Sequence, residues 1–239
     1  MKKLFSIPLL FTVLALFGCA QEYTISGTID GAVDGDSVVL GYSVDGEEFT
    51  VTDRTVIENG EFHFDGKVNG SKIYYIGYEQ SPEPMYLLFF LEGGDIGIRM
   101  SGEESRVTGT PSNELNAEVE ATIMDYVTQL LGAEVILESD DDTVSDSLRV
   151  ALHQKLYDTQ RDVSQYIRST VFRNKKSIVS LYMMIQYVDL FGVEEIEQYV
   201  SEVPAENIDR NNNCLYDILV EALNDRKNNP GELPLLDFE

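Results

Sequence analysis

The sequence predicts an α+β protein, in which an N-terminal antiparallel β-sandwich over residues 19–112 precedes an all-helical domain over residues 113–229. Two observations support this prediction. In the first half, apolar and polar residues alternate between closely spaced turn signals, which is typical of short sandwich strands. After residue 112 the apolar residues recur every three or four positions, which is the period of an amphipathic helix. Residues 1–18 form a separate signal segment, and residues 230–239 an extended tail.

The signal segment begins with the positively charged Lys2 and Lys3 and continues as a mostly apolar run over residues 4–17. This run is too short to cross a bilayer, which takes about 20 apolar residues. It ends in Leu16-Phe17-Gly18-Cys19, which resembles the lipobox of bacterial lipoproteins. We therefore expect residues 1–18 to be a lipoprotein signal peptide. The alternative is an ordinary secretory signal that happens to end beside a cysteine.

Lipidation of Cys19 would determine where the protein acts. In lipoproteins this cysteine carries a diacylglyceryl group and its freed amine is acylated. Several chains are needed, because one acyl chain alone binds a membrane only marginally. Ala20 stands where an Asp would retain a lipoprotein in the inner membrane. The resemblance therefore implies an outer-membrane lipoprotein, facing the periplasm or the cell surface, that contacts the membrane through a lipid anchor at Cys19.

The composition argues against several kinds of protein. The formal net charge is −25 at pH 7, so the chain repels nucleic acid and anionic membrane surfaces, and we expect no nucleic-acid partner. The chain has 2 cysteines. Because the lipid uses Cys19, only Cys214 is left, which excludes a disulfide framework and a C-x-x-C redox pair.

Turn signals divide the first half into strands. Asn59-Gly60 predicts a type I′ turn, because both central residues of that turn need a positive φ angle. Beyond it, Phe62 and Phe64 should face the core and His63 the solvent. Before it, we expect three positions in the core: Phe49, Val51 and Val56.

Residues 86–91 are apolar without interruption. An antiparallel strand with one solvated face would alternate, so this run predicts a strand that is covered on both faces.

Four short motifs occur in a fixed order along the first half: Gly27-Thr28-Ile29, then Asp53 through Asn59-Gly60-Glu61-Phe62-His63-Phe64, then Phe90-Leu91-Glu92-Gly93-Gly94-Asp95-Ile96, and Val107-Thr108-Gly109-Thr110. Their order resembles the uncharacterised β-domain at the N-terminus of lipid-anchored thiol–disulfide oxidoreductases (thioredoxin superfamily, AhpC/TSA-like) of Gram-negative bacteria. Where that family commonly has Ser after Asp53, this chain has Arg54.

The second half predicts helices separated by short turns. Thr110-Pro111-Ser112 offers an N-cap and a first-turn proline. One apolar stripe then follows through Leu115, Val119, Ile123, Tyr126 and Leu130. A second helix, capped by Thr143 or Ser145, carries Leu148, Leu152, Leu156, Val163, Ile167 and Val171. A third, over residues 178–191, is apolar on most sides and should be central; shorter helices are expected over residues 193–200, 204–208 and 215–223.

The same resemblance assigns this helical region to the segment that precedes the thioredoxin-like domain. The tail Gly231-Glu232-Leu233-Pro234 with Asp237-Phe238 resembles the opening of that domain, and the sequence given ends there. We therefore expect an anchor with non-catalytic modules whose redox domain is missing.

Few residues suggest chemistry. His63 and His153 are the only histidines, and we expect both at the surface, without a G-x-S-x-G elbow to make a hydrolytic triad. Cys214 follows three asparagines at a helix start, which favours a thiolate, yet a packed thiol is the simpler interpretation.

Two acidic groups were weighed as calcium sites: Asp30, Asp34 and Asp36 around two glycines, and Asp140 to Asp142 with Asp146. Neither has EF-hand spacing, so we predict no metal and no cofactor. Paired carboxylates of a glycoside hydrolase stay possible in so acidic a chain, but no pair is singled out.

Together these observations predict a lipid-anchored cell-envelope protein that is not an enzyme and has a binding or scaffolding role, with an envelope protein as its partner. The alternative is the N-terminal portion of a membrane-anchored thiol–disulfide oxidoreductase whose redox domain is absent or supplied in trans.

Overall fold

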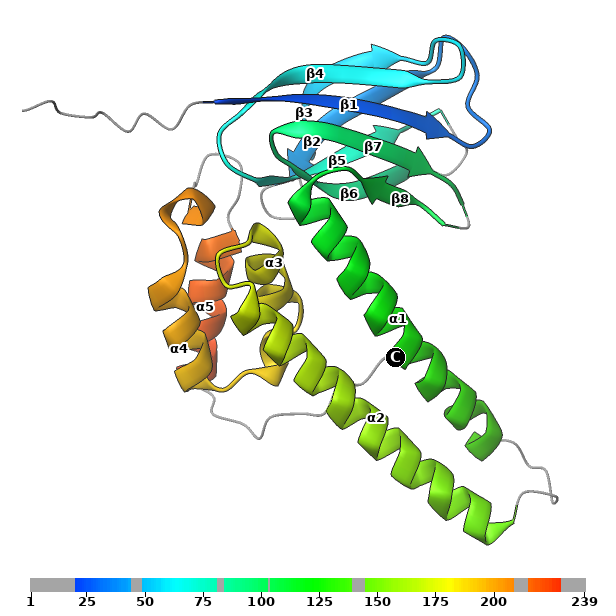
Figure 1. Cartoon of the computed structure of the whole chain (residues 1–239), viewed down its shortest axis with the longest axis vertical. Helices are drawn as coiled ribbons and strands as arrows, with labels where there is room; N and C mark the ends of the chain where they lie inside the picture. Colours follow the sequence, from blue (N-terminus) through cyan, green and yellow to red (C-terminus); the bar gives the residue numbers. More distant parts are fainter. Residues whose placement is uncertain are drawn as a thin grey trace, which may run out of the picture.

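A computed structural model describes residues 20–43, 49–80, 84–102, 104–138, 145–208 and 215–228. It shows the predicted α+β class: two four-stranded sheets are followed by helices (Figure 1). One sheet has the strand order β4-β1-β7-β8 and the other β3-β2-β5-β6. The strand bounds are β1 Gln21–Ile29, β2 Ser37–Ser43, β3 Phe49–Val56, β4 Phe62–Val68, β5 Lys72–Tyr78, β6 Met85–Leu91, β7 Gly94–Met100 and β8 Arg106–Thr108.

The sheets are rich in antiparallel pairs, but β1 pairs parallel with β7. The predicted antiparallel sandwich is confirmed as two antiparallel-rich sheets, with this one parallel pair as a difference. Strand β1 enters the first sheet, the chain then crosses to the other sheet and back twice, and β7 returns beside β1 in the same direction. A period of two in the sequence tells which face of a strand is buried but not which strand will be its neighbour.

The turn at Asn59-Gly60 has the predicted backbone, with φ angles of 54° and 81°. It joins β3 of one sheet to β4 of the other, and a bridge between Glu58 and Glu61 closes it. Beyond the turn, Phe62 and Phe64 are buried and His63 is exposed, as predicted.

Strand β3 departs from the prediction. Phe49 is only half-buried, and Val51 and Val56 are exposed, so these expected core positions are wrong. The reason is that β3 lies at the edge of its sheet, paired with β2 alone. The core position at this end of the strand is taken instead by Ile57, which is buried.

Strand β6 is covered on both faces over residues 89–91, as its apolar run predicts, whereas Tyr86 at the start of that run is 49 % exposed. Phe89 and Leu91 belong to the core between the two sheets. Phe90 points the other way, into a second core formed by the helices, where its ring meets that of Tyr182 at 5.9 Å. A single strand therefore takes part in both hydrophobic cores.

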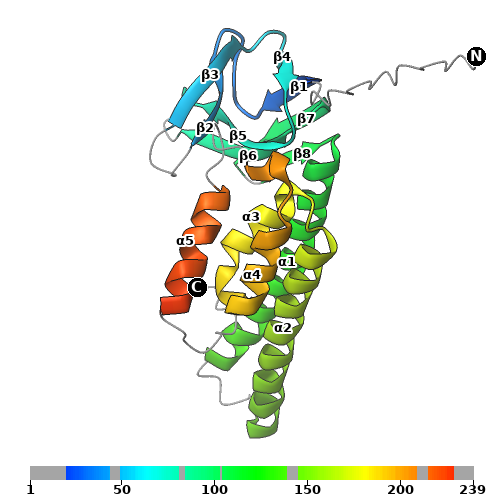
Figure 2. The same ribbon diagram turned by 90° about the vertical axis from the view of Figure 1, so that its left-hand side faces the viewer.

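The helical region contains α1 Pro111–Glu138, α2 Asp146–Arg173, α3 Ile178–Gln186, α4 Val193–Glu202 and α5 Leu215–Asn228, with short 3₁₀ turns at Val188–Leu190 and Ala205–Ile208. Figures 1 and 2 show that α1 and α2 form an antiparallel hairpin extending away from the sandwich, past the ends of α4 and α5. Most residues of α3 are buried, as expected of a central helix, but α3 ends at Gln186 and the rest of the helix predicted over residues 178–191 contains the first 3₁₀ turn. Within the described ranges no helix has the length and apolarity to cross a membrane.

The predicted apolar stripe of α2 becomes more buried toward the C-terminus of the helix, and Leu152 and Leu156 in its N-terminal half are half-buried. Val163, Ile167 and Val171 are fully buried, whereas Leu148 is exposed. The N-terminal half of α2 lies in the projecting part of the hairpin, away from α3, α4 and α5 (Figure 2). Of the two predicted caps, Ser145 is the one that accepts the Leu148 amide, at 3.3 Å; Thr143 lies outside the described residues.

Polar side chains fix the start of α1 to the sandwich. The amide of Asn113 bonds both backbone groups of Phe90: Nδ2 donates to the carbonyl at 2.8 Å, and Oδ1 accepts from the N–H at 2.9 Å. Glu92 accepts from the Ser112 backbone N–H and hydroxyl, both at 2.7 Å, and from the Ser71 hydroxyl at 2.5 Å. A carboxylate at a helix N-terminus is also favoured by the helix dipole. The direction in which the hairpin leaves the sandwich is set by these buried bonds.

We predict that Asn113→Ala will lower the free energy of unfolding by about 2–4 kcal/mol, because it leaves two buried backbone groups of Phe90 unpaired. Denaturant titration followed by circular dichroism will measure the change. The control is Asn116→Ala, which removes an exposed bond to Glu120 and should cost less than about 0.5 kcal/mol. Equal effects of the two variants would contradict the assigned role of Asn113.

Candidate functional site

The outer face of the β4-β1-β7-β8 sheet brings together three residues that the sequence did not connect. The Ser26 hydroxyl lies 3.1 Å from Nδ1 of His63, and Nε2 of His63 lies 3.5 Å from the Glu61 carboxylate. The pairing of β1 with β4 places Ser26 directly opposite His63. The alternation of residues along β4 predicts the exposure of His63 but not these neighbours, because the pattern of one strand does not show which strand pairs with it.

A shallow hollow of about 290 Å³ adjoins these residues, lined by Ser26, Glu61, Arg99, Arg106 and Thr108 among others. It lies where Gly97 presents no side chain between Ser26 on β1 and Thr108 on β8, its partners across the sheet. The hollow is open, and hydroxyl and guanidinium side chains contribute to its lining, although most of that lining is apolar.

The trio has the composition of a hydrolytic triad but a different environment. In such triads the carboxylate is buried, so that it holds and stabilises the imidazole. Here the His63 and Glu61 side chains are 61 % and 58 % exposed. Water competes for both groups, and a charge pair in this setting is worth at most about 1 kcal/mol. We interpret the trio as a surface hydrogen-bond network.

The first acidic group weighed as a calcium site is distributed among structural partners. Asp30 pairs with Arg99 at 3.3 Å, and Asp34 accepts the Gly60 amide at 2.9 Å. Asp36 accepts from the Tyr78 hydroxyl at 2.6 Å and from the backbone N–H of Val33, which together lower the pKa of the Asp36 carboxyl. Each carboxylate thus stabilises a different part of the loop.

The remaining candidate residues lie on helix α2 or outside the described part of the chain. His153 is exposed on α2, and Asp146 begins that helix. Cys19, Cys214 and Asp140 to Asp142 lie outside the described residues. Across the ranges that the structure covers, no three histidine, cysteine or acidic side chains are grouped to hold a metal.

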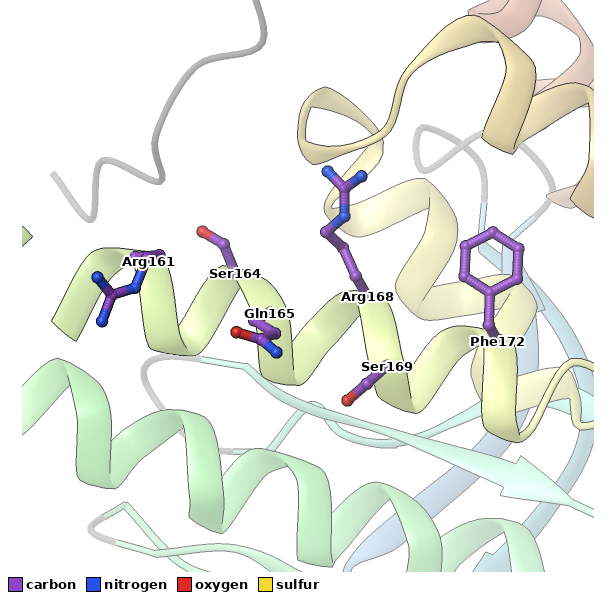
Figure 3. A pocket seen from close by; sticks show the side chains of 6 residues that line it. All are labelled: Arg161, Ser164, Gln165, Arg168, Ser169 and Phe172. Atoms are coloured by element: carbon purple, nitrogen blue, oxygen red, sulfur yellow. The ribbon is translucent and has the colours of Figure 1, made fainter. Parts of the chain in front are cut away.

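The outer face of α2 carries a second, more apolar hollow of about 460 Å³ (Figure 3). It is lined by Arg161, Ser164, Gln165, Arg168, Ser169 and Phe172. The Ser164 hydroxyl donates to the carbonyl of Gln160, and that of Ser169 to the carbonyl of Tyr166, so both hydroxyls are bonded to the backbone of their own helix. The hollow is therefore a surface for contact rather than for chemistry.

The guanidinium groups in this hollow already have anionic partners. Arg168 donates to both oxygens of Glu195 at 2.6 Å and lies over the Phe191 ring at 5.8 Å. Arg161 pairs with Asp158 at 2.9 Å and Asp162 at 3.1 Å. A phosphate or carboxylate ligand would have to compete with these carboxylates, which disfavours an anion site.

The middle and outer parts of the hairpin expose large apolar side chains. Met124, Leu131 and Val135 on α1, with Val150 and Tyr157 on α2, are each between 49 % and 69 % exposed. We call these five residues the hairpin patch. Exposed apolar groups are common singly, but a group on one projecting element marks an interaction surface.

Tyr199 of α4 is 1 % exposed, and within the described part of the chain its hydroxyl has no partner in hydrogen-bonding geometry. The neighbouring Ser180 hydroxyl donates to the Val171 carbonyl at 2.6 Å. Burial raises the pKa of Tyr199 to about 12, against a smaller lowering effect of Ser180. This phenol is a buried polar group in the helical core, and its ring lies 6.3 Å from that of Phe172, which lines the α2 hollow.

Comparison with known proteins adds one identification. Residues 23–116 match the family described as Domain of unknown function (DUF4369). This segment is a DUF4369 domain. It spans the sandwich from Tyr23 of β1 and continues through the first turn of α1. No curated protein matches the chain.

The DUF4369 domain agrees with the uncharacterised β-domain expected from the motif order. Its extent is informative, because it includes Glu92, Ser112 and Asn113 and so contains the polar junction with α1. The description assigns no activity, and the predicted link to thiol–disulfide oxidoreductases is taken up as a proposal below.

We predict that Tyr199→Phe will leave the free energy of unfolding at pH 7 unchanged or raise it by up to about 2 kcal/mol, because it removes a buried unpaired hydroxyl. Its second effect concerns alkaline stability. An unfolded tyrosine loses its proton near pH 10. The folded pKa of Tyr199 is about 12. Below pH 10 its raised pKa therefore contributes about 2–3 kcal/mol to the free energy of unfolding, and this contribution is lost as the pH rises from 10 to 12.

Denaturant titrations at pH 9 to 12 will test both effects. The wild type should lose stability more steeply over this range than Tyr199→Phe. The half-buried Tyr216 of α5 provides the control substitution Tyr216→Phe. A Tyr199→Phe protein that is clearly destabilised at pH 7 would show that the hydroxyl makes a bond missing from this account.

Proposed function

We propose that the protein is a lipid-anchored component of the bacterial outer membrane with a non-catalytic binding or scaffolding role. The observation that supports this best is the hairpin patch, whose α1 residues lie about 20 to 36 Å along this 28-residue helix. A projecting hairpin with solvated apolar side chains loses free energy to hydration unless another surface covers it. In this proposal the DUF4369 domain is the base and the hairpin is the binding element.

The anchor in this proposal is Cys19, at the end of the N-terminal apolar run. Strand β1 starts at Gln21, so the sandwich begins two residues after the lipid. The formal net charge of −25 repels anionic lipid headgroups. The acyl chains would therefore supply the attachment, while the acidic body stays in solution beside the bilayer.

We predict that Cys19→Ala will move the protein from the membrane fraction to the soluble fraction, because the acyl chains are the only membrane contact proposed. Immunoblotting of fractionated cells will measure the distribution. Cys214→Ser is the matched cysteine control and should remain with the membrane. Retention of Cys19→Ala in the membrane fraction would overturn the lipoprotein assignment.

The binding role predicts a specific cross-linked product in intact envelopes. A lysine-reactive cross-linker applied to cells should join the tagged protein to its partner, and Val135→Glu should reduce that product at least about tenfold, because a charge replaces an apolar contact. Val33→Glu is the control, since Val33 is equally exposed but lies on a sandwich loop. If both variants keep the product unchanged, the hairpin is not the binding element.

A second candidate rests on the motif order and the DUF4369 domain. In it the chain is the non-catalytic part of a membrane-anchored thiol–disulfide oxidoreductase, with the redox domain supplied in trans. Mass spectrometry of the same cross-linked product discriminates the two. A thioredoxin-like partner would favour this candidate, and any other partner would favour the scaffold.

A further inference from the structure

We propose that the partner of the hairpin is a second copy of this chain. Two hairpins would pack into a four-helix bundle in which α1 of one copy lies beside α2 of the other. This inference rests on the proposed binding role and assigns its partner. Three features of the hairpin lead to it: its apolar stripes, its charge distribution and its direction relative to the anchor.

The hairpin patch forms one stripe on each helix. Met124, Leu131 and Val135 are spaced by seven and four residues, which places them on one side of α1. Val150 and Tyr157 are seven residues apart and share one side of α2. Stripes with this spacing are the seams by which helices associate in bundles.

The two helices carry opposite charge. Helix α1 has six acidic residues and no basic one: Glu114, Glu118, Glu120, Asp125, Glu134 and Glu138. Helix α2 has five basic residues against three acidic ones, the basic set being Arg149, Lys155, Arg161, Arg168 and Arg173. Two α1 helices side by side would repel each other. Beside the α2 of another copy, a helix of charge −6 meets one of net charge 5 − 3 = +2, of whose basic residues Arg161 and Arg168 already pair with Asp158, Asp162 and Glu195.

The anchor selects the same arrangement. The hairpin points away from the sandwich, where the described chain begins at residue 20 (Figure 1). Two copies held in one bilayer must have both sandwiches at the same end. A two-fold axis along the hairpins achieves this, and it places each α1 next to, and antiparallel to, the α2 of the other copy. Tethering in one membrane also raises the effective concentration of the two copies.

Two contacts within the hairpin show which residues of α1 and α2 lie at the same level along the hairpin axis. The rings of Tyr126 and Tyr166 lie 6.3 Å apart, and Arg149 donates to the Leu137 carbonyl at 2.9 Å. Counting from these two pairs, Leu131 lies at the height of Tyr157 to within about one helical turn. Met124 lies at the height of the α2 hollow of Figure 3. In the proposed dimer, Leu131 therefore approaches the other copy's Tyr157, and Met124 its α2 hollow.

Cysteine cross-linking between two differently tagged copies tests this pairing. One copy carries Leu131→Cys and the other Tyr157→Cys, both full-length, in a Cys214→Ser background, expressed together in cells. A short bismaleimide should give a product with both tags, in at least about tenfold greater yield than two Leu131→Cys copies give. A product with both tags cannot arise within one chain. Val33→Cys paired with Tyr157→Cys measures the background from chance encounters.

The remaining outcomes each decide the matter. Equal yields for the mixed pair and for two Leu131→Cys copies would overturn the pairing of α1 with α2. A mixed yield at the Val33→Cys background would overturn self-association. If self-association fails while Val135→Glu still removes a product with another envelope protein, the binding role stands and the second copy is the wrong partner. Val135→Glu should in addition shift purified protein toward monomer in sedimentation velocity, with an unchanged circular dichroism spectrum.

Discussion

Strand β6 takes part in two hydrophobic cores, and the rest of the architecture follows from it. Because successive side chains of a strand point to opposite faces, the run at its end sends Phe89 and Leu91 into the sandwich and Phe90 into the helices. The strand therefore contributes buried side chains to both cores. The hydrogen bonds from Asn113 to the backbone of Phe90 attach α1 at the same place. The same short segment of β6 is therefore stabilised both by the burial of its apolar side chains and by hydrogen bonds to its backbone.

This shared strand explains how a slender hairpin can serve as a binding element. Helix α1 begins under the sandwich, fixed by Glu92 and Asn113, and α2 returns to bury Val163, Ile167 and Val171 among the other helices. The hairpin is therefore rigid at its base, and its outer half is left to solvent. A surface held in one direction loses less entropy when a partner covers it, which favours association.

Much of this organisation was predictable from local patterns. The turn at Asn59-Gly60, the buried stripe of α1 and the two-sided strand β6 all follow from φ preference or from apolar period. These local patterns do not show which strands and helices lie beside one another. Val51 has the residue type of a core position, yet it is exposed because β3 has a neighbour on one side only. The meeting of Ser26 with His63 and the exposure of Leu148 likewise depend on which elements pack beside them.

The central claim is that the sandwich and the helices form one structural unit through β6. Hydrogen–deuterium exchange with mass spectrometry, run in rising denaturant, tests it most directly. Peptides covering β4 and α3 should lose their protection together, at the same denaturant concentration. If α3 exchanges fully while β4 stays protected, the two cores unfold independently and β6 does not join them.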